Sequence, residues 1–324
     1  MKLQQFRSIW AVAHHQLNIS ETAKTLFTSQ PAISKHIMLL ENELGVEIFS
    51  RRGRHMVEIT PAGEKIIQIA GEVLKHVDSI RQVAEEYSNP DKGSLRLAVT
   101  HMQARYVMPQ VIEQFQQRYP EVAIQFQQES PDHVAELVRE SHMDMVLTSN
   151  ESVESQDLVL LPCFRWRQSL VVPKDHPLAQ LGQPTLAEVA EFPLITYASH
   201  SAGHKEVEQA MCNRKIQANI ACTASDSDVI KSCVRMGMGV GVLATMAVEK
   251  ADQLDLAVID ASHLFTPSTS YLGIWRHAFL REFHHHFIEL LAAQLDRELV
   301  AQVRQTDSPD KRHRLLKSVE LPLL

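Results

Sequence analysis

The sequence lacks a long hydrophobic run. Hydrophobic residues make up 44% of its 324 residues, yet no apolar stretch approaches the roughly 20 residues that a membrane-spanning helix requires. The N-terminal segment MKLQQFRSIW contains no secretory hydrophobic region followed by a small-residue cleavage site. We therefore expect a cytoplasmic protein with no membrane partner, long enough for two or three domains.

Cysteine is scarce, and enzyme motifs are missing. The four cysteines form no C-x-x-C pair, which argues against a zinc ribbon or a dithiol redox site and favours free thiols. The sequence has no G-x-S-x-G elbow, Walker loop or H-E-x-x-H. GMGVG at 237–241 leads into an apolar strand instead of opening a helix. These absences predict a protein that is not an enzyme and needs no cofactor.

Three consecutive histidines, His284, His285 and His286, suggest a metal site at first sight. Consecutive helical positions point about 100° apart, so the three rings cannot all bind one ion. We therefore expect a partly exposed helix face and no bound metal.

Charge is unevenly distributed along the chain. The first 61 residues carry seven Lys and Arg against five Asp and Glu, whereas the remainder carries 25 against 34. A cationic head on an acidic body permits nucleic-acid binding by the N-terminal part, although a solvated surface has the same balance.

The N-terminal residues predict three helices. The first spans residues 3–13 with Leu3, Phe6, Ile9, Trp10 and Ala13 on one stripe. The second runs from Asn18, which has capping-box spacing with Glu21, to about Phe27. The third begins at Ser29 and ends at Gly45, and Ile33, Ile37, Leu40 and Leu44 form its buried stripe. Two short helices joined by a tight turn indicate a helix-turn-helix.

The third helix and the segment after it supply the candidate DNA contacts. Gln30, Ser34 and Lys35 are expected to reach base edges, within a segment that also contains Pro31 and Ala32. A small arginine-bearing wing follows this helix. The side chains expected to contact phosphates are Ser29 at the start of the third helix, Arg51, Arg52 and Arg54 of the wing, and Thr60.

The run TAKTLFTSQPAISKHIMLLENELGVEIFSRRGRHMVEITPAG resembles the winged helix-turn-helix signature of LysR-type transcriptional regulators. The segments PDKGSLRLAVTHMQARYVMP, DHPL at 175–178 and SDVIKSCVRMGMGVGV are similar to the branch that contains the cysteine-biosynthesis regulator. The resemblance implies a regulator that binds double-stranded promoter DNA, responds to a small effector and contacts RNA polymerase if it is an activator.

Residues 62–90 predict a linker helix with an apolar seam. Ile66, Ala70, Val73, Val77, Ile80, Ala84 and Tyr87 follow the 4, 3 spacing of a coiled coil. A helix that packs only on its own domain is the alternative, but so narrow a stripe favours a homodimer, or a homotetramer built from dimers. Two recognition helices held one DNA turn apart would then match a pseudo-palindromic site.

From residue 91 to 304, strands alternate with helices, which predicts an α/β domain with parallel sheets. A long helix is expected at about 278–303, and another carries Val134, Leu137 and Val138. The resemblance implies a periplasmic-binding-protein-like pair of lobes, the first at about 94–162 and 268–304 and the second at about 163–267. The chain would cross near 162–165 and 265–270. The tail 305–324 is either disordered or docked.

Ligands of open α/β sheets bind at the carboxyl ends of strands. Hydroxyl and amide side chains follow three strands there, at 100–103, 148–149 and 196–201, with Ser225 nearby. The resemblance implies that Thr100, Gln103 and Ser149 belong to the effector site. Together with the residues beside them, the expected effector-binding set is Thr100, Met102, Gln103, Thr148, Ser149, Ser201 and Ala202.

The chain departs from the pattern of that branch at two places. Met102 replaces a hydroxyl in T-H-T-Q, and Ala202, Gly203 and His204 replace T-G-R. The effector expected from the resemblance is a small anion of sulfur metabolism: sulfate, thiosulfate, O-acetylserine or N-acetylserine. A less polar sulfur compound or an unrelated small acid is the alternative. Two other classes of protein share the α/β lobes but are disfavoured. A solute-binding protein would lack the winged head, and an α/β enzyme would show catalytic motifs.

Overall fold

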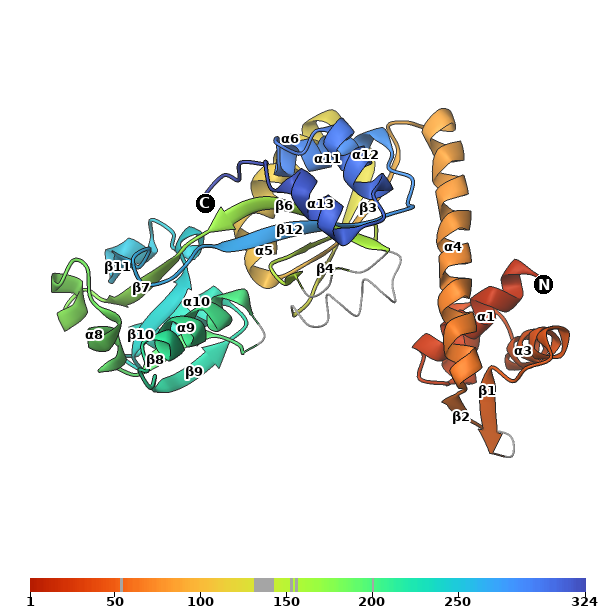
Figure 1. The fold of residues 1–324 in the computed structure, drawn as a ribbon, viewed down its shortest axis with the longest axis horizontal. Helices are drawn as coiled ribbons and strands as arrows, with labels where there is room; N and C mark the ends of the chain where they lie inside the picture. The colour runs from red at the N-terminus through yellow and green to blue at the C-terminus, as the bar shows by residue number, and fades with distance from the viewer. Residues whose placement is uncertain (53–54, 131–142, 152–153, 155–156, 200) are drawn as a thin grey trace. The chain divides into compact units, whose positions relative to one another are not determined.

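The computed structural model describes residues 1–52, 55–130, 143–151, 154, 157–199 and 201–324. Two compact units, Met1–Ser88 and Asn89–Leu324, make up the chain (Figure 1). Within the described ranges, no helix is both long and apolar enough to cross a membrane.

The first unit is a three-helix head with a two-stranded wing. Its elements are α1 (Leu3–His14), α2 (Ile19–Thr25), α3 (Gln30–Leu44), β1 (Phe49–Arg52), β2 (His55–Ile59) and α4 (Pro61–Ser88). The predicted ends of two helices are confirmed. Asn18 accepts a hydrogen bond from the Glu21 amide at 3.1 Å, and Gly45 follows α3 with φ of 71°. The core of this unit includes Ile9, Val12, Ala23, Ile33, Ile37, Leu40, Ile48 and Phe49.

Three details of the head differ from expectation. Leu44 was predicted to be buried but is 37% exposed, and Leu3, which was placed on the apolar stripe of the first helix, is 41% exposed. Each is a terminal residue of its helix and lies beyond the reach of the core. Ser29 occupies the N-cap position of α3, yet its side chain makes no capping hydrogen bond.

The N-terminal part of α4 packs within the first unit. A Cβ on Gly63 would lie 2.1 Å from the Ile48 carbonyl oxygen, so only glycine permits this approach. Ala70, placed in the predicted intermolecular seam, is instead 2% exposed inside the head's core, and Ile66 packs against the same core. The alternative of a helix that packs on its own domain therefore holds for this first part of α4.

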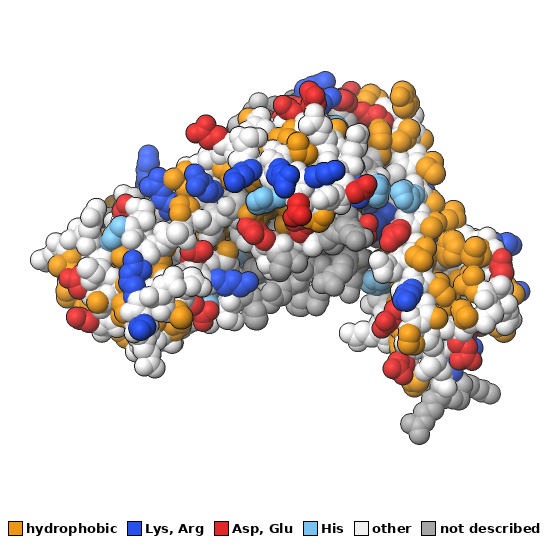
Figure 2. All heavy atoms as spheres, in the orientation of Figure 1, with side chains coloured by type: hydrophobic (Ala, Val, Ile, Leu, Met, Phe, Trp, Pro, Cys, Tyr) orange, Lys and Arg blue, Asp and Glu red, His pale blue; other side chains and the backbone are white. Residues whose placement is uncertain are grey.

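Farther along α4, the apolar residues are more accessible. Val73 and Val77 are half-buried, Ala84 is exposed, and Ile80 is 69% exposed. Figure 2 shows hydrophobic side chains along this helix. The part of the predicted seam that is available to a partner chain therefore begins after Ala70.

The second unit contains two five-stranded sheets. The first has the order β4-β3-β5-β12-β6. Its strands are β3 (Gly93–Val99), β4 (Val122–Gln128), β5 (Met145–Thr148), β6 (Leu158–Trp166) and β12 (Ser268–Trp275). β3 is parallel to β4 and β5, and β12 is antiparallel to its neighbours.

The second sheet has the order β11-β7-β10-β8-β9. Its strands are β7 (Gln168–Pro173), β8 (Leu194–Tyr197), β9 (Ile220–Ala224), β10 (Val240–Ala244) and β11 (Leu256–Asp260). We call the lobes built on the two sheets lobe I and lobe II. β6 stays paired with β12 up to Trp166, so the chain leaves lobe I at Arg167, two residues beyond the region near 162–165 in which the crossing was expected. It returns between β11 and β12.

Helices cover both sheets (Figure 1). Those that follow lobe I strands are α5 (His101–Tyr106), α6 (Met108–Arg118), α11 (Glu282–Leu291), α12 (Arg297–Gln305) and α13 (Pro309–Leu316). Those of lobe II are α8 (Leu186–Ala190), α9 (Ala202–Asn213) and α10 (Ser227–Arg235). The predicted helix with Val134, Leu137 and Val138 lies outside the described residues.

In the C-terminal region, the prediction of one long helix is wrong, and the tail, which was expected to be either disordered or docked, is docked. The long helix expected at 278–303 is two helices, because Ala292 leaves helical geometry at φ −153° and Asp296 caps α12 through the Leu299 amide at 2.8 Å. The tail is docked. Beyond α13, Arg165 donates to the Pro322 carbonyl and Leu324 donates to the Arg165 carbonyl, each at 2.8 Å.

Candidate functional sites

The recognition segment of α3 lies on the surface of the head. Gln30, Pro31 and Lys35 are exposed, while Ala32 and Ser34 are half-buried beside the core residue Ile33. The Gln30 amide nitrogen donates to the Ser20 hydroxyl at 2.9 Å, which fixes the side chain across the turn between α2 and α3. Three of the five predicted contact residues of this helix are therefore accessible.

The wing uses two of its predicted phosphate contacts for its own structure. Arg51 pairs with Glu41 at 2.6 Å, and the other oxygen of Glu41 accepts from the amides of Ile48 and Phe49. The Thr60 hydroxyl donates to the Glu47 carbonyl at 2.7 Å and accepts from the Gly63 amide at 2.9 Å.

The Thr60 hydroxyl therefore caps α4, and its contact with a phosphate stays a prediction. Arg51 is partly committed to the head's internal ion pair. Arg54 lies outside the described residues, as does the side chain of Arg52.

A cavity of about 150 Å³ lies between the two lobes of the second unit. A cavity of this volume accommodates a group of about the size of benzene. Both lobes contribute to its wall. The lining residues are Thr100, His101, Met102, Glu129, Ser130, Ser149, Trp166, Tyr197, Ala198, Ser201, Ala202, Gly203 and Ser225.

The structure brings together five of the seven predicted effector residues: Thr100, Met102, Ser149, Ser201 and Ala202. Gln103 and Thr148 do not line the cavity, since both are completely buried. Thr148 accepts a hydrogen bond from the Asn150 amide at 3.1 Å. These two residues lie behind the lining residues, and their contact with an effector stays a prediction.

Gln103 holds a polar network behind the cavity. Its Oε1 accepts from the Thr100 hydroxyl at 2.8 Å, and its Nε2 donates to the Ser270 hydroxyl at 3.2 Å. The Ser149 hydroxyl lies 3.0 Å from that of Ser270 and accepts from Trp166 Nε1 at 3.3 Å. The network therefore fixes two hydroxyls and one indole ring of the lining.

Tyr197 fixes the opposite wall, in lobe II. Its hydroxyl accepts from the Ala244 amide at 2.9 Å and lies 2.8 Å from the Ser227 hydroxyl. Burial raises the pKa of this phenol. A Cβ on Gly203 would meet the tyrosine ring at 2.7 Å, so glycine is required where α9 begins.

Several residues that line the cavity were not predicted from the sequence. Glu129 and Ser130 follow β4, so the rule that placed Thr100 after β3 would have found them if applied to this strand as well. Tyr197 ends β8 and Trp166 ends β6. As apolar residues at strand ends, they resemble core residues in sequence.

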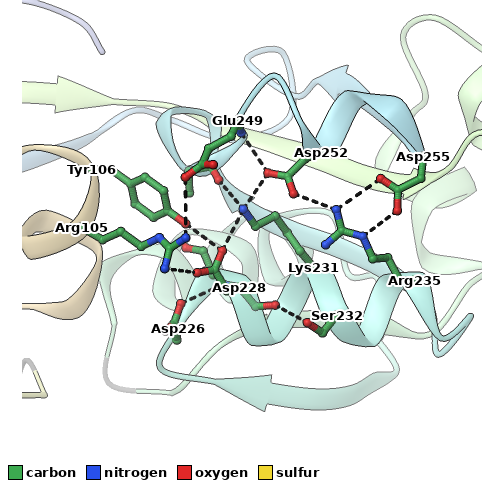
Figure 3. Close-up of polar contacts among 12 residues, drawn as sticks. Arg105, Tyr106, Asp226, Asp228, Lys231, Ser232, Arg235, Glu249, Asp252 and Asp255 are labelled. Atoms are coloured by element: carbon green, nitrogen blue, oxygen red, sulfur yellow. Dashed lines mark hydrogen bonds and ion pairs between the residues drawn. The ribbon is translucent and has the colours of Figure 1, made fainter.

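A cluster of ionic contacts joins the lobes beside the cavity (Figure 3). Arg105 and Tyr106 of α5 contact Asp228 of α10 at 2.6 and 3.0 Å. Asp228 also pairs with Lys231 at 2.9 Å, and Lys231 pairs with Asp252 at 2.7 Å. We call these five residues the interlobe clasp.

The clasp is partly withdrawn from solvent. The Lys231 side chain is 3% exposed and also donates to the Ala247 carbonyl at 3.0 Å. Burial lowers the pKa of Lys231, but its hydrogen bonds to Asp252 and Asp228 raise the pKa by more. The net shift is therefore upward. Burial raises the pKa of Tyr106 to about 12. Both residues therefore keep their protons at neutral pH.

Comparisons with known proteins identify the two units. The family described as "Bacterial regulatory helix-turn-helix protein, lysR family" matches residues 3–64. The family described as "LysR substrate binding domain" matches residues 88–296, more than half of the chain. The chain belongs to the LysR family. It is a DNA-binding transcriptional regulator and not an enzyme.

Named relatives of this LysR regulator extend over nearly its full length. It is 41% identical over 321 residues to the HTH-type transcriptional regulator CysB of Haemophilus influenzae, covering 99% of both chains. It is 38% identical to the HTH-type transcriptional regulator cbl of Escherichia coli, covering 92% of this chain and 94% of the relative.

A solved structure, the cofactor-binding domain of the Cbl transcriptional regulator, is 36% identical with a TM-score of 0.63. It covers 66% of this chain and 95% of that domain. The winged head, the linker helix and the two-lobed α/β unit predicted from sequence are thus the architecture of this family.

Proposed function

We propose that the protein regulates genes of sulfur metabolism by binding promoter DNA in the cytoplasm under the control of a small effector. The observation that supports effector control is the cavity, because its wall is built from both lobes. A ligand that contacts both walls changes the relative stability of lobe arrangements, which is the energetic requirement for control by a ligand.

The head supports the proposed DNA contacts. Lys35 lies exposed on α3, and the Ser29 hydroxyl is not used to cap that helix. Gln30, Ser34 and Lys35 would approach base edges, with Pro31 and Ala32 beside them, while Ser29, Arg52 and Arg54 would contact phosphates. A homodimer or homotetramer would present these faces in pairs, and an activator of this kind would also contact RNA polymerase.

Transmission to DNA would run through α5. Its first turn, at Thr100 to Met102, lines the cavity, and its last residues, Arg105 and Tyr106, form the clasp with lobe II. An effector that tightens the cavity would therefore act on the clasp through one short helix, and a change of lobe angle would alter the spacing of the bound half-sites.

The proposal is tested by selecting genomic fragments that the full-length protein retains and footprinting them with and without sulfur metabolites. We expect at least one metabolite to change the footprint or the DNA bend. If saturating metabolites that bind the protein leave both unchanged, effector control of DNA geometry is contradicted.

The phosphate contacts have a separate test. Arg52→Ala should weaken binding to all retained fragments by a similar factor and reduce the slope of log affinity against log salt by about one, because one phosphate contact is lost. Filter binding at several salt concentrations measures both. Loss confined to particular sequences would contradict a phosphate role.

A further inference from the structure

The chain passes from lobe I to lobe II through a very short crossing. Trp166, the last residue of β6, pairs with β12 in lobe I, and Gln168, the first residue of β7, pairs with β10 in lobe II. Arg167 lies between them, and its carbonyl accepts from the Thr245 amide at 2.9 Å. Because hinges between rigid parts consist of a few residues that absorb the change in backbone angle, movement of the lobes at this crossing is concentrated around Arg167.

The C-terminal tail is seated on the strand that leads into this hinge. The two backbone bonds at Arg165, from its amide to Pro322 and to its carbonyl from Leu324, place Leu323 beside it as a parallel bridge. At its other edge, β6 pairs with β12. Arg165 is therefore held from both edges, two residues before Arg167. The C-terminus lies at the end of β6 that leads into lobe II (Figure 1).

The same attachment bears on the wall of the cavity. Trp166, next to Arg165, lines the cavity, and its Nε1 donates to the Ser149 hydroxyl at 3.3 Å. While the tail is seated, the last residues of β6 have a neighbouring strand on each side, so the backbone of Trp166 has little freedom to shift. The tail is thus linked through one peptide bond to the cavity and through two to the hinge.

The tail runs along lobe I before it reaches the hinge. At its start, Arg276, directly after β12, donates to the Arg304 carbonyl at 2.9 Å. β12 ends beside Leu158, the first residue of β6, whereas the tail ends beside Arg165. Residues 305–324 therefore span almost the whole of β6, and we call them the strap.

The strap is attached by few contacts. Leu315 and Leu316 of α13 pack against the core, and Arg312 is only 2% exposed. Arg312 lies 3.4 Å from the Glu154 carboxylate, but its Nε and Nη1 have no hydrogen-bond partner in the described part of the chain. A buried guanidinium with incomplete bonding is costly, which offsets part of the apolar contact. Leu323 is 39% exposed. Detachment of the strap therefore requires less free energy than global unfolding.

We infer that the strap is a removable clamp on the interlobe hinge. Seated on β6, it holds Arg165 and Trp166 in place and restricts the movement of lobe II against lobe I. Detached, it frees the edge of β6 and permits a wider range of lobe arrangements. The inference concerns the hinge itself, so it does not depend on the proposed function or on which effector the cavity binds.

The test compares the full chain with a chain that ends at Ser318 and so lacks both bonds to Arg165. Hydrogen exchange reports on the Arg165 amide, and electron paramagnetic resonance reports distances between spin labels at Gln117 in lobe I and Lys205 in lobe II. Labels carried by unnatural amino acids leave the native cysteines unmodified. In the shortened chain, we expect exchange at Arg165 to rise at least tenfold and the distance distribution to widen about 1.5-fold.

Two proline variants of the full chain refine this comparison. Leu324→Pro removes the amide that donates to Arg165 and keeps the rest of the strap, so it should widen the distance distribution in the same direction. Glu320→Pro places the same ring in the exposed part of the strap before the bridge, and it should match the unmodified protein. Exchange at Val242, which is completely buried in β10, should stay slow in every variant and shows that lobe II is folded.

Two outcomes would overturn the clamp. Lobe distances that stay unchanged in both the shortened chain and Leu324→Pro would show that the strap does not restrict the hinge, even if Arg165 exchanges faster. Exchange at Arg165 that stays equally slow without the strap would show that the two backbone bonds do not protect this strand. If the shortened chain loses protection at Val242, the comparison of Leu324→Pro with Glu320→Pro decides.

Discussion

Gln103 shows how a single buried side chain can shape a cavity that it does not line. Its amide accepts from Thr100 and donates to Ser270, and it approaches Ser149 at 3.5 Å. The side chain is completely buried. Because buried polar groups are costly when unpaired, the network has a single well-satisfied arrangement, and that arrangement orients the hydroxyls of the wall.

Gln103→Ala should therefore lower stability as well as effector affinity. We expect a loss of about 1–3 kcal/mol in the free energy of unfolding, since hydroxyls of Thr100 and Ser270 lose their partner. Urea unfolding measures the change, and thermal shift with ligand measures the affinity. Gln209→Ala, on the exposed face of α9, is the control. A variant that loses ligand affinity at full stability would indicate direct contact with the ligand instead.

The residues of the cavity were predictable where a polar side chain directly follows a strand. Thr100 and Ser149 satisfy this rule, and Ser201 lies four positions after the end of β8. Gln103 also follows β3, but whether a polar side chain faces the ligand or supports its neighbour depends on tertiary packing. The partners of Arg51 and Thr60 were unpredictable for a similar reason: Glu41 and the Glu47 carbonyl are brought to them by the folded head and not by the local sequence.

At the level of elements, α5 connects two sites with different chemistry. Its N-terminal end lines the cavity, and its C-terminal end contributes Arg105 and Tyr106 to the interlobe clasp (Figure 3). The Arg105 side chain is 51% exposed, so its ion pair contributes little to stability. Its importance would lie in biasing the lobe arrangement.

The double variant Arg105→Gln, Tyr106→Phe should loosen that bias without altering the cavity. We expect stability within about 1 kcal/mol of the unmodified protein, but a broader distribution of distances between spin labels placed on the two lobes. Arg118→Gln removes an exposed pair with Asp91 and serves as the control. An unchanged distance distribution and an unchanged effector response would argue against the clasp as a conformational element.

The clasp also predicts a dependence of stability on pH. Burial raises the pKa of Asp252, but hydrogen bonds from Lys231 and Arg235 outweigh it and hold the pKa at about 2, below the ordinary 3.8. Because the folded pKa is the lower one, this contribution is present above about pH 4 and is lost as the pH falls towards 2.

Asp252→Asn should accordingly flatten the acid limb of a plot of unfolding free energy against pH. Urea titrations at closely spaced pH values, followed by tryptophan fluorescence, provide the comparison. A variant with the same acid limb as the unmodified chain would show that Asp252 does not carry the pH dependence.

For the whole molecule, the order of domains was predictable because each signal is local. Caps at Asn18 and Gly45 define helices, and β-then-α alternation defines the sheets. Features that depend on contacts between distant parts of the chain were not predictable. The docking of the tail on Arg165 brings together segments far apart in the chain. The extension of β6 to Trp166 depends on pairing with β12 across about a hundred residues.

Assembly is the remaining property of the whole molecule that the sequence pattern addresses. The seam of α4 is divided by its surroundings: Ala70 is buried in the head, while Ile80 is 69% exposed in the single chain. An exposed row of apolar residues at heptad spacing is stabilised when a partner helix covers it. Dimerisation should therefore depend on Val73, Val77, Ile80 and Ala84 more than on Ile66 and Ala70.

Ile80→Lys should consequently convert the oligomer to monomers, because a charge would be buried at a seam position. Light scattering coupled to size-exclusion chromatography measures the mass, and the head should retain its fold since Ile80 is outside its core. Gln82→Lys places the same charge on the opposite face of α4 and should leave the mass unchanged. An Ile80→Lys protein of unaltered oligomeric mass would show that another surface assembles the regulator, and loss of tight binding to paired half-sites would accompany the predicted monomer.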